Sequence, residues 1–459
     1  MKTSVVLLAA GLGTRMKSSL PKVLHPIAGK PMIWHILEAV KTIANEKPVV
    51  VIGHGAEQVS QFLEGKAEMI RQEPLLGTAH AVIQAESHVK GKTDLVLVCY
   101  ADMPLLRAET FQHLMDVQQK NKGPMTILTV ISHDPRGFGR ILRKQDKSVQ
   151  AIVEETAASS EQLSIKELNV GCYCFNSEWL WGALHRIQKN AEKGEYYLTD
   201  IVGLAVADNL PVQAVTLEDS QEAIGINSRV HLAEVEAAMR SRINHAHMVN
   251  GVTLVDPAST YVDTGVMIGE DTTILPNTFL QGEVRIGKNC VIGPNTLIKD
   301  SIIEAECSIL ASVLEGARVE EHVHIGPFAR LRKGAHLMAG VHMGNFGEVK
   351  ESTLGPGVKM GHFSYVGDAK IGAETNIGAG TITCNFDGER KHETTIGENA
   401  FIGSDTMLVA PLKIGDRART GAGAVVTKNV PPDTLVVGMP ARAIKKLIGD
   451  TGIRTESTK

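Results

Sequence analysis

The sequence contains no apolar run as long as the roughly 20 residues that a membrane-spanning helix needs. The apolar stretch after Met1-Lys2-Thr3 is interrupted by glycine too early for a signal peptide. A strong excess of one charge is also absent, since the net charge is −4 and the pI is about 6.5. These absences argue against a membrane span and against a nucleic-acid-binding surface.

Cysteines with metal-binding or redox spacing are absent too. The six cysteines show no Cys-x-x-Cys motif and no cysteine–histidine pattern of the zinc-binding kind. We therefore expect reduced, buried thiols in a cytoplasmic protein. The cysteines are Cys99, Cys172, Cys174, Cys290, Cys307 and Cys384.

Aromatic residues are scarce at 4%, whereas glycine is abundant, with 44 in 459 residues. Over residues 262–298 an aliphatic residue recurs at every sixth position. Neither an α-helix nor a single β-strand has this period, but a chain that turns a corner every six residues does. The ladder consists of Val262, Ile268, Ile274, Leu280, Ile286, Ile292 and Ile298.

The same period recurs later and predicts a hexapeptide-repeat, left-handed parallel β-helix, in which about eighteen residues complete one triangular turn. Glycine follows many of the aliphatic residues, as in Ile286-Gly287, which suits tight corners. Between Ile377 and Ile396 the spacing is nineteen residues, and the polar segment 381–392 is predicted to project as a loop. The later ladders are Val313, Val319, Ile325, Leu331, Leu337, Met343 and Val349, and then Ile396, Ile402, Leu408 and Ile414.

Residues before the ladders alternate between apolar strands and helical segments. This pattern predicts an α/β domain with a doubly wound, mostly parallel, Rossmann-like sheet. A helical period follows over 229–248, and Asn227 or Ser228 can cap that helix. We expect a first domain over 1–229, a linker helix over 230–250 and the β-helix domain over 251–459, whose last residues, 449–459, are polar and expected to be loose.

A glycine-rich turn, Leu8–Met16, follows the first predicted strand. Small residues let a nucleotide approach the backbone, and exposed amides can hold phosphate. Arg15 and Lys22 add positive charge. The turn is neither a P-loop nor the dinucleotide fingerprint, and an ordinary tight turn is the alternative. Asp102 follows another strand, where its carboxylate suits Mg²⁺ or caps a turn.

These stretches resemble the sugar-nucleotide pyrophosphorylases. More closely, the chain resembles the bacterial bifunctional enzymes N-acetylglucosamine-1-phosphate uridyltransferase/glucosamine-1-phosphate N-acetyltransferase. Further segments that carry the resemblance are Pro21–Leu24, Gln72–His80, Gly137–Ile141, Gly194–Asp200, Gly326–Gly334, Gly344–Lys350, Gly361–Asp368, Asn376–Asp387 and Gly403–Pro411.

For the first domain, the resemblance implies transfer of UMP from UTP to N-acetylglucosamine 1-phosphate. Gln72, Gly77 and Thr78 would read the uracil, and Arg15 and Lys22 would neutralise phosphates. Ala101 stands where many relatives have glycine. The other implied positions are Leu8, Ala9, Ala10 and Gly11 for the nucleotide, Tyr100 and Ala101 beside it, Gly139, Glu154 and Asn169 for the sugar, and Asp102 and Asn227 for Mg²⁺.

In the coil, His362 stands out among seventeen histidines, because an amide, a lysine, arginines and a tyrosine surround it on successive turns. An imidazole can take a proton from an attacking amine. His54, His80, His245 and His247 are expected to be structural or exposed.

The resemblance implies that the coil transfers acetyl from acetyl-CoA to glucosamine 1-phosphate, with His362 as the general base. Asn385 and Phe386 lie where relatives carry Asn-Tyr. Relatives place an arginine near Met439 for coenzyme A, and here either Arg442 substitutes for it or the contact is lost. The implied sugar-phosphate contacts are Arg332, Lys350, Tyr365 and Asn376, and the implied acetyl-CoA contacts are Ala379, Asn385, Phe386, Ser404, Ala422 and Arg442.

Two alternatives remain open on sequence alone. The coil is an assembly or regulatory module of a nucleotidyltransferase, or the first domain is degenerate and the chain is an acyltransferase. The length of the coil and its residues around His362 argue against the first, and intact Arg15, Lys22, Asp102 and Asn227 argue against the second. The resemblance further implies a cytoplasmic homotrimer that feeds peptidoglycan and lipopolysaccharide precursors.

Overall fold

The structure is a computed structural model that describes residues 1–191 and 193–446. Its backbone contacts divide the chain into two compact units, Met1–Met239 and Arg240–Lys459. The expectation for residues 449–459 falls outside the described residues. Among the described helices, none is long and apolar enough to cross a membrane.

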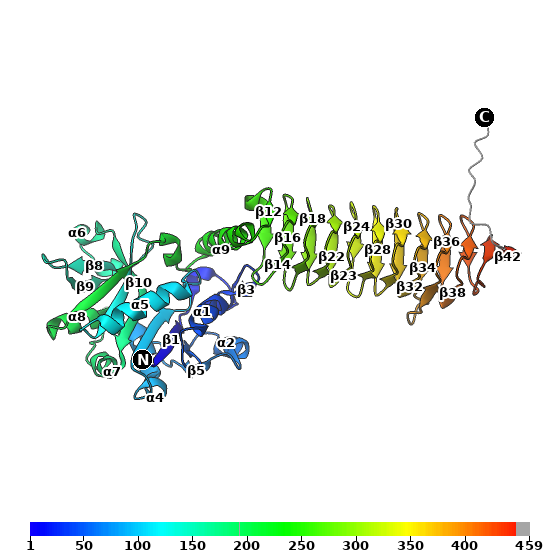
Figure 1. Cartoon of the computed structure of the whole chain (residues 1–459). Helices are drawn as coiled ribbons and strands as arrows, with labels where there is room; N and C mark the ends of the chain where they lie inside the picture. The colour runs from blue at the N-terminus through cyan, green and yellow to red at the C-terminus, as the bar shows by residue number, and fades with distance from the viewer. Residues whose placement is uncertain (192, 447–459) are drawn as a thin grey trace. The chain divides into compact units, whose positions relative to one another are not determined.

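The N-terminal unit is built on one sheet with helices on both sides (Figure 1). Its strand order is β11-β7-β10-β6-β1-β4-β5, and β10 alone runs antiparallel to its neighbours. A hairpin of β8 (Arg140–Arg143) and β9 (Val149–Val153) extends from β10. The other strands are β1 (Thr3–Ala9), β4 (Val49–Ile52), β5 (Glu68–Arg71), β6 (Leu95–Tyr100), β7 (Met125–Ile131), β10 (Glu167–Asn176) and β11 (Val212–Thr216).

The central strands are almost continuously aliphatic because both faces of the sheet are covered. This confirms the predicted doubly wound fold. In β1 and β6, Leu8 lies opposite Tyr100, so the turns that follow the two strands lie side by side at one edge of the sheet. The helices are α1 (Met32–Lys41), α2 (Ala56–Leu63), α3 (Thr78–Gln84), α4 (Glu86–Val89), α5 (Ala108–Lys120), α6 (Ser160–Leu163), α7 (Ser177–Leu184) and α8 (Asp200–Ala207).

The predicted linker is helix α9 (Arg229–Val249). The Ser228 hydroxyl accepts a hydrogen bond from the amide of His231 at 3.3 Å, so Ser228 caps this helix. The cap interpretation of Asn227 is wrong, because its side-chain oxygen faces Lys22.

The C-terminal unit is a triangular coil whose three faces are parallel sheets. The first face begins at β12 (Thr253–Leu254), the second at β13 (Thr260–Val262) and the third at β14 (Met267–Ile268). In the described residues, each strand pairs with the strand one turn later, except that β42 (Arg442–Lys446) runs back antiparallel to β41 (Thr434–Val437).

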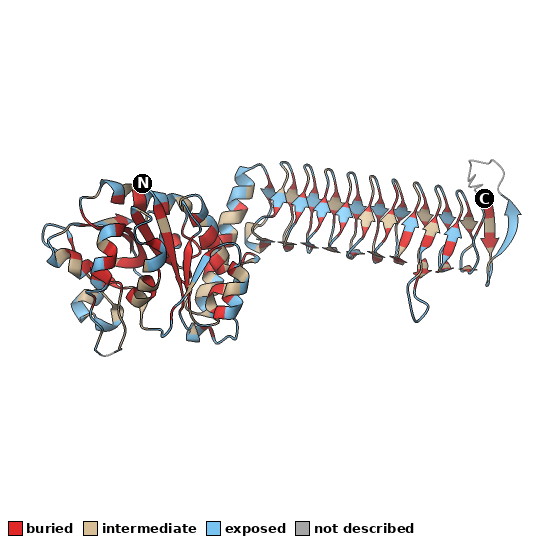
Figure 2. Cartoon of the chain, turned by 90° about the horizontal axis from the view of Figure 1, so that it is seen from below, coloured by how far each residue is buried: buried red, intermediate tan, exposed pale blue. Residues whose placement is uncertain are grey.

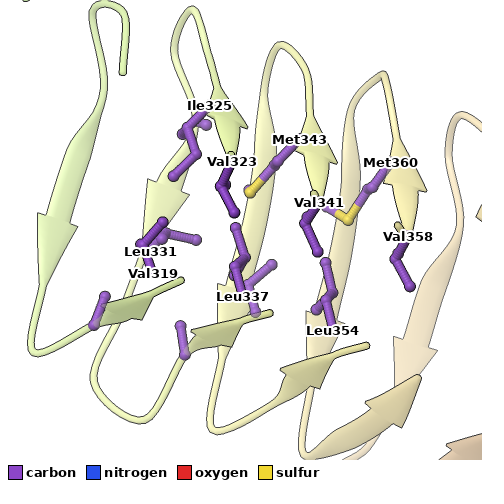
Figure 3. Close-up of a cluster of buried hydrophobic side chains, with 14 of the residues drawn as sticks. Val319, Val323, Ile325, Leu331, Leu337, Val341, Met343, Leu354, Val358 and Met360 are labelled. Atoms are coloured by element: carbon purple, nitrogen blue, oxygen red, sulfur yellow. The ribbon is translucent and has the colours of Figure 1, made fainter. Parts of the chain in front are cut away.

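One aliphatic side chain per face points into the coil, and these side chains stack in rows along it (Figure 3). The first predicted ladder is confirmed, since successive members fall on successive faces. Val313 is wrong as a core residue, because it is 38% exposed and Leu314 is buried in its place. From Ile298 to Leu314 on the second face the turn is only 16 residues long, two fewer than eighteen. Leu314 lies five positions before the next core residue, Val319, so a strict six-residue ladder falls on Val313 instead.

The interruption of the coil lies where the sequence predicts it, but it is longer than one extra residue. Thr383 to Ile396 spans 13 positions, whereas the same two faces one turn later, Leu408 to Ile414, span 6. The seven additional residues form a loop that projects from the coil between β34 (Ile382–Cys384) and β35 (Thr394–Ile396) (Figures 1 and 2).

All six cysteines are unpaired, and five of them are buried as predicted. Cys384 departs from the prediction, because it is only partly buried on the second face.

Two candidate active sites

The N-terminal unit has a cavity of about 350 Å³ where β1 and β6 end. The glycine-rich turn forms one wall, and the turn before α3 forms another. Ten of the predicted nucleotide-site residues line this nucleotide cavity: Leu8, Ala9, Ala10, Gly11, Lys22, Gln72, Gly77, Thr78, Tyr100 and Asp102.

A second cavity of about 210 Å³ shares Tyr100 and Asp102 with the first. We call it the sugar cavity, because the residues that the resemblance assigns to the sugar line it. These are Gly139, Glu154 and Asn169, and Asn227 joins them. Tyr100 packs against Gly171, where a Cβ atom would lie 2.2 Å from the tyrosine ring.

Opposite charges meet where the two cavities join. The Lys22 ammonium donates a hydrogen bond to Asp102 Oδ2 and lies 3.4 Å from Asn227 Oδ1. Two hard oxygens thus face one cation, which is the donor chemistry that Mg²⁺ takes from a protein when phosphates supply other ligands. The described residues contain no group of three or more His, Cys, Asp or Glu able to hold a metal, so an ion here would depend on such a pair.

The side chain of Gln72 is 5% exposed and fixed by its neighbours. Its amide nitrogen donates to the Gly77 carbonyl at 2.9 Å and lies 3.0 Å from Nδ1 of His80. Burial lowers the pKa of His80, which keeps the imidazole neutral and able to accept this bond. The two contacts are made by the amide nitrogen of Gln72, so its carbonyl oxygen is available to accept a hydrogen bond from a nucleotide base.

Burial and the carboxylates of Glu154 and Asp102 raise the pKa of Tyr100 well above its ordinary value. Its hydroxyl stays protonated and hydrogen-bonds with Thr78. Tyr100 is therefore an uncharged side chain that borders both cavities.

Two predicted residues are not among the described residues that line either cavity. Arg15 is exposed on the short helix Thr14–Met16. Ala101 is fully buried, and its amide donates to the Leu8 carbonyl at 3.0 Å.

In the coil, the charged residues predicted for the sugar phosphate gather on the second face. Arg332 follows β25 (Arg330–Leu331), Lys350 ends β28 (Gly347–Lys350), and Tyr365 lies on β31 (Ser364–Gly367). A Cβ atom on Gly367 would lie 2.4 Å from the Tyr365 hydroxyl, so glycine makes room for that group. Arg332 Nη1 donates to Glu348 Oε1 at 2.9 Å.

His362 lies on the corner between the first and second faces and is exposed. Ala379, Ser404 and Ala422 occupy the same corner on the following turns. Backbone hydrogen bonds fix this column, from Asp405 to the Ala379 carbonyl at 2.6 Å and from Gly423 to the Ser404 carbonyl at 2.8 Å. Asn376 lies before the corner, on β33 (Asn376–Ile377) of the first face.

The projecting loop folds back toward the charged face. Asn385 is buried, and its amide donates to the Asp368 carboxylate. Phe386 is 60% exposed and forms a β-bridge with Lys391. Arg442 lies on the exposed strand β42, which follows the last turns of the coil.

Lys391 and Asp368 are functional candidates that the sequence analysis missed. The nearby cations of Lys391 and Arg332 lower the pKa of Lys350, and the Lys391 ammonium lies 3.9 Å from the Asp368 carboxylate. Lys391 is 41 positions after Lys350, and only the folded loop brings the two together.

Comparison with known proteins agrees with this two-part organisation. The MobA-like NTP transferase domain matches residues 5–163, and the bacterial transferase hexapeptide model matches 265–300 and 393–428. Curated relatives named "Bifunctional protein GlmU" match nearly the full length. Those from Streptococcus mutans and Syntrophomonas wolfei are 46% and 47% identical over 95% of this chain, covering 95% and 97% of the relatives. That from Streptococcus thermophilus is 44% identical over 97% of both chains.

The chain belongs to the GlmU family of bifunctional proteins.

This membership confirms the resemblance drawn from the motifs. The chain is an enzyme with a nucleotidyltransferase and an acyltransferase activity. Both single-activity alternatives are excluded, because the GlmU relatives are bifunctional and the chain matches both of their halves.

Proposed function

We propose that each unit houses one step of UDP-N-acetylglucosamine synthesis. The coil acetylates glucosamine 1-phosphate from acetyl-CoA, and the N-terminal unit then joins the N-acetylglucosamine 1-phosphate to UMP from UTP and releases pyrophosphate. The observation that carries the proposal is the pair of adjoining cavities that share Tyr100 and Asp102, since one fits a nucleotide and the other a sugar phosphate.

In the nucleotide cavity, Gln72 and the turn of Gly77 and Thr78 hold the base. In the sugar cavity, Glu154 and Asn169 hold the sugar. A phosphate oxygen of the sugar attacks the α-phosphorus of UTP in line, and pyrophosphate leaves. Because no covalent protein intermediate forms, positioning and charge neutralisation by Lys22 and Arg15 determine the rate.

Asp102 and Asn227 would hold Mg²⁺, with substrate phosphates as further ligands. When bound, the ion withdraws charge from the phosphate oxygens. The Lys22 ammonium that now faces both oxygens is then available to a phosphate.

In the coil, Arg332, Lys350 and Lys391 surround the sugar phosphate, and His362 removes a proton from the attacking amine. The amine nitrogen bonds to the acetyl carbon, and the coenzyme A thiolate leaves. Ser404 stands on the same corner as His362, where its hydroxyl can stabilise the oxyanion.

We also propose a cytoplasmic homotrimer. His362 is exposed on a corner, while Lys350 and Asn376 project from the different faces that meet there, so one coil does not enclose these groups. The same corner exposes a row of aromatic rings, Phe328, Phe346 and Phe363, which are 59%, 60% and 55% exposed. Such a surface favours packing against another copy of the chain.

One assay tests the proposal. Purified protein receives glucosamine 1-phosphate, acetyl-CoA, UTP and Mg²⁺, and free thiol and pyrophosphate are followed separately. We expect thiol release first and pyrophosphate release after it. Release of pyrophosphate without thiol, or of thiol without pyrophosphate, would contradict the assignment of two steps.

A further inference from the structure

The segment Glu195–Thr199, here called the strap, borders both cavities of the N-terminal unit. Glu195 lines the nucleotide cavity. At the other end, the Thr199 hydroxyl donates to Glu154 Oε1 at 2.8 Å, and Glu154 lines the sugar cavity. Neither the motif analysis nor the proposed mechanism gives the strap a role.

Three hydrogen bonds fix the strap to the turn that reads the base. The Tyr196 amide donates to the Leu76 carbonyl at 2.8 Å, and the Ala79 amide donates to the Tyr196 carbonyl at 3.0 Å. The Leu198 amide donates to Thr78 Oγ1 at 2.9 Å. The contact is tight, because a Cβ atom on Gly77 would lie 2.6 Å from the Tyr196 carbonyl oxygen.

The other end of the strap determines how the Glu154 carboxylate is presented. Thr199 is 4% exposed, and Leu198 before it is fully buried, so the threonine hydroxyl has a fixed position. Glu154 lies in the connection after β9 and has a long side chain whose ordering costs conformational entropy. The hydrogen bond to one carboxylate oxygen orders the Glu154 side chain before a ligand binds, so binding does not carry this entropy cost. The second carboxylate oxygen remains available to the ligand.

We propose that Thr199 is a positioning residue for the sugar phosphate: it orients the Glu154 carboxylate toward sugar hydroxyls. This inference rests on the proposed uridyl transfer and specifies how its sugar is recognised. Because hydrogen bonds tie the strap to Leu76, Thr78 and Ala79, it holds Thr199 at a fixed position relative to the nucleotide cavity.

The test replaces Thr199 with valine, which keeps the shape and removes the hydroxyl. Loss of a hydrogen bond to a carboxylate should raise KM for N-acetylglucosamine 1-phosphate about ten- to hundredfold. The KM for UTP should stay unchanged, because the backbone bonds of the strap to the base-reading turn persist. Thr199→Ser should restore the wild-type KM. Initial rates of pyrophosphate release with Mg²⁺ measure all of these values.

Thr216→Val is the matched control, since Thr216 ends β11 and its hydroxyl bonds Thr129 at 3.0 Å. This variant should leave both KM values unchanged. Thiol release from acetyl-CoA by the same preparations reports whether the coil remains folded and active.

The inference is overturned if Thr199→Val leaves the sugar-phosphate KM unchanged, if both KM values rise together, or if serine does not rescue. If the wild-type protein itself released no pyrophosphate from UTP and this sugar phosphate, the proposed function would fail, and the role of Thr199 with it.

Discussion

At the residue scale, the side chain of Asn227 shows how one neighbour determines the chemistry of another. Asparagine before a helix is ordinarily a cap, but Ser228 supplies the cap of α9. The Asn227 oxygen is therefore left to face the Lys22 ammonium and, in the proposed function, Mg²⁺.

Two single substitutions should separate these roles. Asn227→Ala should lower the rate of pyrophosphate release at limiting Mg²⁺ by about tenfold or more while leaving the melting temperature nearly unchanged. Ser228→Ala should destabilise the N-terminal unit by about 1 kcal/mol, because an N-cap is lost. Calorimetry and initial rates measure both effects. If Asn227→Ala and Ser228→Ala destabilised the protein equally, the assignment of the helix cap to Ser228 and not to Asn227 would be contradicted.

His80 makes base recognition sensitive to pH. Burial lowers the pKa of His80 below 6.5, so the folded protein holds it neutral, and protonation below that pH opposes the native arrangement. A protonated Nδ1 would point a donor at the Gln72 amide nitrogen, its neighbour at 3.0 Å.

We therefore expect KM for UTP to be constant at and above pH 6.5 and to rise only as the pH falls through the lowered pKa of His80. His80→Asn, whose amide oxygen remains an acceptor, should lose most of this rise. Because UTP itself titrates in the same range, the comparison of the two proteins in the same buffers is the measurement. Parallel pH profiles would rule out the role of His80.

At the element scale, the projecting loop is an insertion into a structure that does not need it. Strands on either side of it pair in regular register, with Lys370 opposite Thr395 on the third face. Asp387 closes the loop by accepting bonds from the amides of Glu389 and Arg390, both at 2.8 Å. These bonds and the contact with His392 hold the pKa of Asp387 below its ordinary value.

Replacement of residues 386–391 by two glycines should therefore leave the coil folded but remove Lys391 from the cluster around Lys350. We expect thiol release to fall by about tenfold or more, since a charge-assisted contact to phosphate is lost. Pyrophosphate release from UTP and N-acetylglucosamine 1-phosphate serves as the internal control. Unchanged thiol release would show that the loop has no part in acetyl transfer.

Elements with a strong period were predictable, and those determined by long-range contacts were not. The aliphatic ladder located the coil, because only one inward side chain per face fits the prism. The ladder misplaced Val313, because one turn of the coil is shorter than eighteen residues. Both Val313 and the buried Leu314 are aliphatic, so residue type does not reveal which of them points inward. The antiparallel direction of β10 and the contact of Lys391 with Lys350 depend on distant segments, so no local pattern in the sequence predicted them.

At the scale of the whole molecule, the way each unit presents its site agrees with its proposed role. The N-terminal unit encloses its cavities within one sheet edge, whereas the coil presents His362 on an open corner. Acetyl transfer should therefore depend on assembly, and uridyl transfer should not.

Analytical ultracentrifugation should give a mass of about three times the 49.4 kDa of one chain. Substitution of Phe346 by a charged residue, as in Phe346→Glu, should dissociate the assembly and reduce thiol release while leaving pyrophosphate release intact. A monomeric wild-type protein with full thiol release would contradict the proposed trimer.

The most direct test of two separate sites compares His362→Ala with Asp102→Ala in both half-reactions. Thiol release is measured with glucosamine 1-phosphate and acetyl-CoA, and pyrophosphate release with N-acetylglucosamine 1-phosphate, UTP and Mg²⁺. We predict that His362→Ala abolishes thiol release and spares pyrophosphate release, and that Asp102→Ala does the reverse. Loss of both activities in either folded variant would contradict the assignment of one site to each unit.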